Sequence, residues 1–147
     1  MSVLAVSAIR QRIATAISTA LGATGWRETT GVYDTFGSID GEGRLHKSYA
    51  VGVPGTAWMK DRQRLIEGAL SETDLRVKWA YNLATKDQLV SYDAGLDAEQ
   101  AILAAVMTCQ AANDLHVTYQ NSNRTVDDQG WMMGELTFKG MHNQPLS

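Results

Sequence analysis

Apolar and polar residues alternate along residues 75–83, where every odd position is apolar and Arg76, Lys78 and Asn82 lie between them. Successive side chains of a strand point to opposite faces, so this period of two predicts a strand with one buried and one solvent-facing side. Residues 45–53 alternate in the same way and predict an earlier strand. We expect the Pro-Gly pair that follows to end that strand.

Two stretches space their apolar residues three and four positions apart, which is typical of amphipathic helices. The first covers residues 3–21, with Ser2 placed to cap its start and Gly22 placed to end it. The second begins at Asp97, where Gln100 completes a capping box. Their apolar stripes are Val6, Ile9, Ile13, Ala16, Ile17, Ala20 and Leu21 in the first helix, and Ala98, Ala101, Ile102, Ala105, Val106, Cys109 and Ala112 in the second.

Three long loops and two closing strands account for the rest of the chain. Loops are expected near residues 25–45, which are rich in glycine, near 56–72, which are densely charged, and near 120–130, which are polar. A short strand at 115–119 and a strand at 131–140 flank the last loop. Loops of this length in compact domains are usually functional or disordered, so these three are candidates for contacts with partners.

The order of these elements predicts an α+β fold, with a single mixed or antiparallel sheet and two amphipathic helices packed on one face. At 147 residues the chain fits one domain, residues 1–147, and is long enough to bury a core without disulfides or metals. A lone Cys109 cannot form an internal disulfide, and Arg10 and Arg12 interrupt the apolar N-terminus. We therefore expect a soluble domain that is made in a reducing compartment.

The net charge of −3 is unevenly distributed along the chain. Residues 1–78 hold ten Lys and Arg against eight Asp and Glu, whereas residues 79–147 hold three against eight. Opposite charges on two surfaces would favour head-to-tail contact between copies. We expect instead that the strands mix the two halves in space and cancel the dipole, because the halves of a single domain usually interleave.

No motif in the sequence has the spacing of a nucleophile triad, a metal site or a phosphate-binding loop. His46, His116 and His142 are scattered, and we expect them at the surface or at sheet edges. Cys109 lies on the second apolar stripe and is expected to be a small core residue rather than a nucleophile. The sequence therefore predicts no catalytic, cofactor-binding or metal-binding residue and no cofactor.

Asp93, Asp97 and Glu99 cluster around the expected start of the second helix. Paired carboxylates can transfer protons, but negative charge at a helix N-terminus also stabilises the helix through capping and the helix dipole. We favour this structural role. The alternative is a small α+β enzyme or ligand-binding domain that uses these carboxylates, His46 or His116 in a concave pocket.

The basic residues between Arg62 and Lys78 are offset almost fully by acidic neighbours. Nucleic-acid binding would need a larger positive excess, so an ion-pair-rich surface or a subunit interface fits better. Arg124, opposite Asp127 and Asp128 in the last polar loop, has the same character. The predicted subunit or partner interface consists of Arg62, Arg64, Glu67, Arg124, Asp127 and Asp128.

The order of elements resembles that of the tail terminator (tail-completion) proteins of long-tailed bacteriophages. An amphipathic helix opens the chain, and a strand such as Ser48-Tyr-Ala-Val-Gly-Val53 and a long charged excursion follow it. The run Leu75-Arg-Val-Lys-Trp-Ala-Tyr-Asn-Leu83 comes next, then the helix start Asp97-Ala-Glu-Gln-Ala-Ile102 and two closing strands. The resemblance is one of pattern and covers most of the chain outside the glycine-rich segment.

This resemblance implies a structural virion protein, not an enzyme, whose protomers assemble into a hexameric ring. Such rings end the tail tube and join it to the head–tail connector, while DNA passes through the lumen without specific binding. The implied partners are further copies of the chain, the tail tube protein and the connector protein, with no membrane involved. The implied location is the tail or neck of the virion, after assembly in the host cytoplasm. The glycine-rich residues 22–45 depart from a minimal protomer and leave open another neck role, such as a stopper or adaptor.

Overall fold

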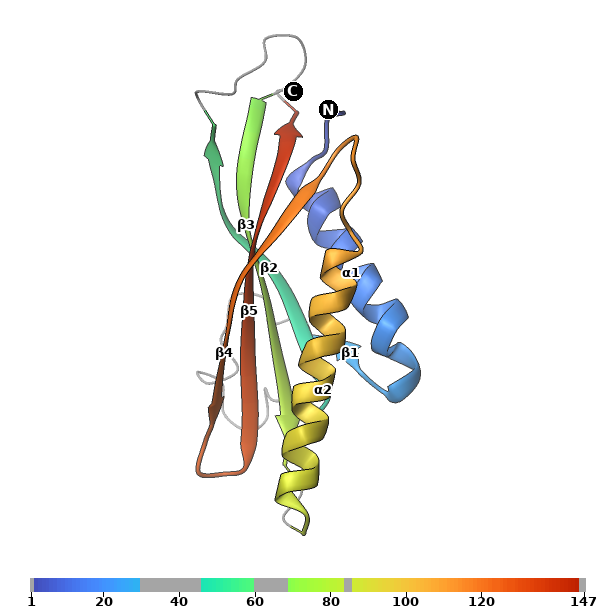
Figure 1. Cartoon of the computed structure of the whole chain (residues 1–147), viewed down its shortest axis with the longest axis vertical. Coiled ribbons are helices and arrows are strands. Elements are labelled where there is room, and N and C mark those ends of the chain that lie inside the picture. Colours follow the sequence, from blue (N-terminus) through green and yellow to red (C-terminus); the bar gives the residue numbers. More distant parts are fainter. Residues whose placement is uncertain (1, 30–45, 60–68, 84–85, 146–147) are drawn as a thin grey trace.

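The computed structural model describes residues 2–29, 46–59, 69–83 and 86–145, which form one mixed sheet of five strands covered on one face by two helices (Figure 1). Neighbouring strands are antiparallel, except for the parallel pair β1 and β2. The predicted α+β fold with a single mixed sheet is confirmed. In spatial order the strands are β1 (Arg27–Glu28), β2 (Ser48–Trp58), β3 (Ala69–Asn82), β5 (Trp131–Gln144) and β4 (His116–Val126).

Two long helices pack side by side on the same face of this sheet (Figure 1). Helix α1 (Val6–Leu21) lies over β1 and β2, and a short 3-10 turn, η1 (Gly22–Thr24), follows it. Helix α2 (Gln88–Met107) lies over β3, β5 and β4. Each helix therefore covers its own half of the sheet. Neither of these two helices of the described chain is long and apolar enough to cross a membrane.

The period of two predicted for residues 75–83 is present in β3. Leu75, Val77 and Trp79 are fully buried under the helices, whereas Arg76 on the other face is exposed. The centres of the two predicted helical stripes meet this face with buried side chains, whereas Ala20 and Ala112 at the stripe ends are exposed. The fully buried apolar side chains are Ile9, Ile13, Ile17, Val51, Leu75, Val77, Trp79, Ala80, Ile102, Val106, Met132, Leu136 and Phe138.

Trp79 occupies the centre of the core, where its indole needs a neighbour without a side chain. Gly134 lies directly opposite it on β5, and a Cβ added at Gly134 would overlap the indole ring. Gly95 of α2 approaches the same place, close to Met132 and the edge of the Trp79 ring. Trp26 packs edge-on against Trp79, with ring centroids 6.4 Å apart. Two glycines thus let a strand and a helix close around one large side chain.

The prediction of a polar loop near residues 120–130 is wrong for most of that range. Strand β4 continues to Val126, and residues 127–130 alone form the turn into β5. Because β4 is an edge strand, most of its side chains are exposed on both faces, so it needs no alternation of apolar and polar residues. A bulge between Tyr119 and Asn121 also shifts the pattern.

The Pro-Gly pair at 54–55 does not end β2, which runs on to Trp58. The register of β2 against β3 shifts between Gly52 and Gly55, so the proline lies within a bulge, where a missing backbone N–H is tolerated. Strand β3 in turn begins at Ala69, so both ends of the predicted loop near 56–72 belong to strands. Its middle, like most of the predicted loop near 25–45, lies outside the described residues.

Helix α2 begins nine residues before the predicted start at Asp97, so the predicted capping box is wrong. The first turns were missed because Leu89 and Val90 are exposed and Gly95 interrupts the apolar period. That glycine is tolerated within the helix because it packs closely against the core. The helix ends at Met107, before the last residues of the predicted stripe.

Helix α1 begins at Val6 rather than residue 3, and Ala5 precedes it without a side-chain capping bond. The predicted cap, Ser2, instead donates its backbone N–H to the Asn113 carbonyl at 2.6 Å. The Leu4 N–H likewise donates to the Asn143 carbonyl at 2.8 Å. Residues 2–4 are therefore held by the loop before β4 and by the end of β5. Gly22 does cap the end of α1. Gly25 caps the short turn η1 that follows, and it has a positive φ of 91°.

We predict that Gly134→Ala lowers the free energy of unfolding by about 3 kcal/mol, because the added methyl displaces the Trp79 indole from a closely packed core. Urea denaturation followed by tryptophan fluorescence measures this loss. The matched control is Gly22→Ala, where the nearest atom to a new Cβ is 3.8 Å away and the backbone is helical. If both variants unfold at the same urea concentration, the role assigned to Gly134 is wrong.

Candidate functional site

The two edges of the sheet carry opposite charge. The strand order places α1, β1 and β2 at one edge and α2, β5 and β4 at the other, with β3 between them. Among the described residues, those up to Lys78 include six Lys and Arg against three Asp and Glu, whereas those from Trp79 onward include three against eight. The two halves mix in part, as expected, because Arg12, Arg76 and Lys78 pair with Asp114 and Glu135, and Lys139 pairs with Glu72 and Asp74. Among the described residues, the elements at the two edges nevertheless keep opposite net charge.

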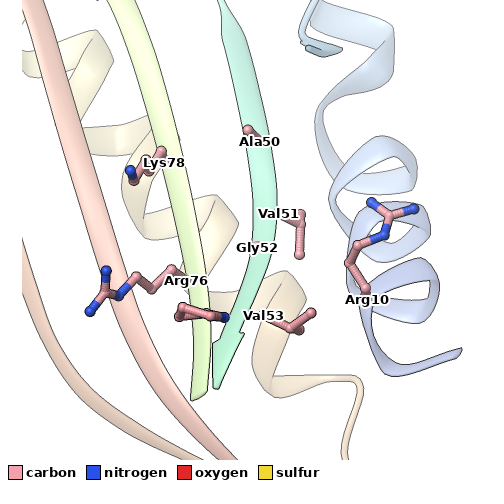
Figure 2. Close-up of a pocket in the computed structure, with 8 residues that line it drawn as sticks. Arg10, Ala50, Val51, Gly52, Val53, Arg76 and Lys78 are labelled. Atoms are coloured by element: carbon pink, nitrogen blue, oxygen red, sulfur yellow. The ribbon is translucent and has the colours of Figure 1, made fainter. Parts of the chain in front are cut away.

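A groove of about 370 Å³ follows β2 at the basic edge (Figure 2). Arg10 of α1 lies on one side of β2, while Arg76 and Lys78 of β3 lie on the other. Strand β1 pairs with β2 only at Ser48 and Tyr49, so within the described ranges the rest of β2 has no strand beside it at this edge. The groove is lined by Arg10, Ala50, Val51, Gly52, Val53, Pro54, Arg76 and Lys78.

The three cations of this groove are only loosely neutralised. Among the described residues, Glu135 is the carboxylate near both Arg76 and Lys78, with N···O distances of 3.9 Å to each. Glu28 lies 3.7 Å from Arg10. Ion pairs of this length at a surface contribute little. The three cations of the groove thus exceed their described carboxylate partners, Glu28 and Glu135, by one charge, which suits an anionic ligand.

The opposite edge presents carboxylates. Asp93 and Asp97 are exposed one turn apart on α2, and Asp128 is exposed in the turn between β4 and β5. Asp127 in the same turn accepts backbone N–H groups of Gln129 and Trp131 on its Oδ1, both at 2.9 Å. Asp127 therefore stabilises the turn, while Asp128 is presented to solvent.

Arg124 was predicted to lie opposite the aspartates of this turn, but it bonds to α2 instead. Its Nε and Nη2 lie 2.7 and 2.6 Å from Oε1 of Glu99, and Trp79 Nε1 donates to Oε2 at 3.2 Å. Glu99 is only 5% exposed and lies in the middle of α2, which begins at Gln88. It is therefore not the helix-start carboxylate that the sequence predicted. The hydrogen bond to Glu99 raises the pKa of Arg124. This contact ties edge strand β4 to α2 and to the core tryptophan.

The other predicted interface residues, Arg62, Arg64 and Glu67, lie outside the described residues. Of the described members of that set, Arg124 and Asp127 have partners within the chain and Asp128 is exposed. Sequence reasoning missed the groove at β2, because Arg10 and Arg76 belong to distant segments. The one signal that pointed to it was the charge difference between the two halves of the chain.

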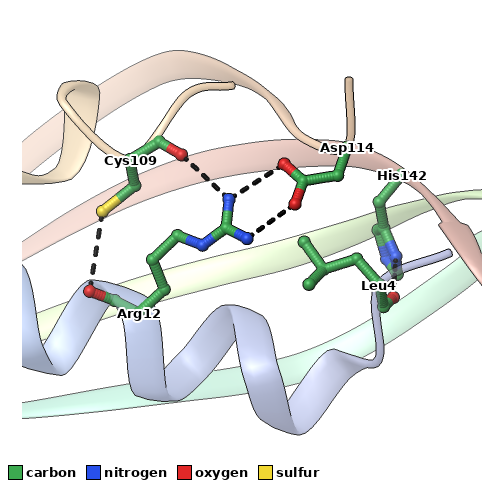
Figure 3. A network of polar contacts seen from close by, with 5 residues as sticks. All are labelled: Leu4, Arg12, Cys109, Asp114 and His142. Atoms are coloured by element: carbon green, nitrogen blue, oxygen red, sulfur yellow. Dashed lines mark hydrogen bonds and ion pairs between the residues drawn. The ribbon is translucent and has the colours of Figure 1, made fainter. Parts of the chain in front are cut away.

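A second polar network joins α1 to the segment before β4 (Figure 3). Arg12 Nη1 and Nη2 bond to Oδ1 and Oδ2 of Asp114 at 3.0 and 2.7 Å, and Nη1 also reaches the Cys109 carbonyl at 3.3 Å. The hydrogen bond from Arg12 lowers the pKa of Asp114. Cys109 is buried, as predicted, and this burial raises the pKa of its thiol. The network therefore fixes α1 against the segment before β4 and is not a reactive site.

His142 is fully buried, which corrects the prediction of a surface or edge position. Its Nδ1 donates to the Leu4 carbonyl at 2.8 Å, and its Nε2 lies 2.7 Å from Thr73 Oγ1. Nothing in the sequence indicates that His142 is buried, because its two partners, Leu4 and Thr73, lie far from it along the chain. Burial lowers the pKa of His142.

The residues proposed for an enzymatic alternative do not converge. His46 lies in the turn before β2 and His116 begins β4, so two strands separate them in the sheet. Asp93 and Asp97 are exposed on α2, whereas Glu99 is buried in an ion pair. In the parts of the chain that the structure describes, no three side chains of His, Cys, Asp or Glu gather to hold a metal ion.

Comparison with known proteins gives a match in structure alone. No family model matches the sequence, and no curated protein matches it. Among solved structures, the fold is similar to a chain of the "Virion of native gene transfer agent (GTA) particle", with a TM-score of 0.56 and 13% sequence identity. The similarity covers 97% of this chain and 99% of that chain. The two chains therefore share their fold over their whole length.

We predict that Arg124→Ala lowers the free energy of unfolding by about 2 kcal/mol, because it removes both contacts of the guanidinium to the buried Glu99 carboxylate and leaves that charge without this cation. Adding Glu99→Gln should recover part of this loss, since the amide carries no charge to bury. Arg76→Ala is the control, because its ion pair is exposed and long. Urea denaturation of the four proteins measures these differences. If Arg124→Ala lowers the free energy of unfolding no more than Arg76→Ala does, the stabilising contact of Arg124 with Glu99, the Arg124 clamp, is ruled out.

We predict that the free energy of unfolding falls as the pH is lowered below about 6.5, because the unfolded chain protonates its histidines there. Folded His142 has a lowered pKa and resists protonation, so its contribution is lost between its unfolded and folded pKa values. His142→Asn should keep the donor to Leu4 and weaken this pH dependence more than His116→Asn, a change at an exposed position, while His46, whose pKa is also lowered by burial, still contributes in both variants. Urea denaturation at pH 7.5 and 5.5 compares them. Equal pH dependence in the two variants would exclude His142 as the source.

Proposed function

We propose that this chain is a structural component of a virion, and specifically a tail terminator that forms a ring at the end of a tail tube. The observation that carries the proposal is the fold shared, from end to end, with a chain of a gene transfer agent virion. The order of elements that resembles tail terminators supports the finer assignment. The absence of converging reactive groups among the described residues is compatible with it.

Ring formation needs two different surfaces on each protomer that fit one another, because a head-to-tail contact joins unlike patches. The protomer has such a pair, with a basic groove at the β2 edge and carboxylates at the β4 edge. Both edges also present strands that are unpaired on their outer side among the described residues. Opposite charges steer such edges together.

The two ends of the sheet supply surfaces for the tube and for the connector. Strand β3 has 14 residues, so the sheet is about 45 Å long at the usual rise of a strand. At one end, Leu89 and Val90 at the start of α2 are 80% and 69% exposed, and the β4–β5 turn lies at the same end of the sheet (Figure 1). At the other end, Trp58 is 52% exposed. Exposed apolar side chains of this size are suited to protein contacts.

The sheet face without helices is suited to a channel through which DNA slides. Its charges alternate in sign and pair across strands, with Lys139 bonded to Asp74 and close to Glu72, and Arg76 and Lys78 close to Glu135. Three cations against three carboxylates give no net positive field. Phosphate contacts that would hold DNA in place need such a field, so this face permits passage without specific binding.

Deletion of the gene in the particle-producing strain tests this function. We expect tails of uncontrolled length that are not joined to heads, and electron microscopy of the particles measures both properties. Supplying the chain from a plasmid should restore tails of uniform length, whereas supplying Gly134→Ala at a temperature where it is unfolded should not. Tails of normal length that lack heads would instead indicate another neck protein. Normal particles without the chain would contradict a virion role.

A further inference from the structure

The β2-edge groove and Asp128 of the β4–β5 turn present opposite charges at the surface of the described part of the protomer. Among the described residues, the lining of the groove has three cations and no carboxylate, and the carboxylates of Glu28 and Glu135 lie 3.7–3.9 Å from those cations. The turn presents Asp128, which forms no ion pair with any described residue. We propose that the groove of one protomer receives the β4–β5 turn of the next copy. This inference rests on the ring proposed above and identifies its subunit contact.

The groove is built to take a short acidic segment. Arg10 on one side of β2 and Arg76 and Lys78 on the other approach a ligand at the strand edge from two directions (Figure 2). Its volume of about 370 Å³ corresponds to roughly a dozen water molecules, which suits the tip of a turn better than a helix or a second sheet. A carboxylate placed there would replace long, weak pairs by shorter ones.

The turn is preorganised for such an insertion. Asp127 holds it through two side-chain bonds, and its backbone N–H donates to the Trp131 carbonyl at 2.9 Å. Gly130 supplies the positive φ of 83° that closes it. Little conformational entropy is then lost when Asp128 is bound. Asp127 stabilises the turn, and Asp128 is the carboxylate that is exposed to solvent.

A second copy explains this pair of features better than nucleic acid does. A groove with three cations offers few phosphate contacts, while the chain as a whole carries a net charge of −3. The complementary turn is already present on the same chain, where β4 and β5, on the other side of β3 from β2, join at one end of the sheet (Figure 1). A contact between groove and turn leaves one groove and one turn free on every pair, so it continues from copy to copy, and it gives a ring when the rotation between copies closes.

Disulfide trapping tests the contact in the full chain. Pro54→Cys at the groove and Asp128→Cys at the turn are made as two single variants, then mixed and oxidised. We expect a covalent dimer on a non-reducing gel, and a ladder of larger oligomers when both changes are in one chain. The matched control replaces Asp128→Cys with Asp93→Cys, another exposed aspartate at the acidic edge. Cys109 is buried and common to all of these proteins.

Charge reversal gives a second measurement that does not need the cysteines. Arg76→Glu and Asp128→Arg should each weaken self-association about tenfold or more, because each places like charges together. The two changes combined in one chain should restore it. Light scattering and native mass spectrometry over a range of concentrations measure this, and circular dichroism checks that each variant folds.

Trapping that does not exceed the Asp93→Cys control, or self-association unchanged by Arg76→Glu, would overturn the contact. Rings that form and end tail tubes without this cross-link would overturn it while leaving the proposed function in place. A chain whose deletion leaves particles normal would remove the proposed function itself. Binding of DNA that Arg76→Glu abolishes without any change in assembly would assign the groove to phosphate and overturn the inference.

Discussion

The burial of the Trp79 indole between the sheet and α2 is the packing constraint on which the rest of the structure depends. Gly134 and Gly95 lack side chains where the ring lies, so β5 and α2 can approach it closely. The indole N–H must have an acceptor inside the core, and Glu99 provides it. The carboxylate in turn needs a cation, which Arg124 brings from β4. One large side chain thus fixes the positions of a helix, a central strand and an edge strand.

This arrangement leaves the two edges of the sheet chemically different. Because the chain completes α1, β1 and β2 on one side of β3 before it builds α2, β4 and β5 on the other, a charge difference along the sequence becomes one in space. The Arg124 clamp holds β4 at the acidic edge, and the groove with Arg10 lies at the basic edge. A protomer with unlike edges joins copies of itself in one direction, which is the requirement for the ring that we propose.

Residue patterns predicted the parts of the fold that bury one face. The alternation around Leu75 and the helical stripe through Ile13 record burial directly, because each position must match the polarity of its surroundings. The same reasoning failed for β4, whose exposed positions carry no alternation, and for the first turns of α2, where Leu89 and Val90 face solvent. It also failed for Pro54, which a bulge accommodates. In the first two cases exposed positions gave no periodic signal, and in the third the pairing of β2 with β3 overrode the local signal of the proline.

The sequence by itself determined the α+β class, the buried faces of the main strand and both helices, and the core position of Cys109, because these depend on the spacing of apolar residues. Only the tertiary structure decided the strand order, and with it the charged edges, the groove at β2 and the partners of Glu99, Asp114 and His142. Those contacts join residues up to 138 positions apart. No local pattern encodes such a pairing, because its energy exists only when the folded chain brings the two groups together.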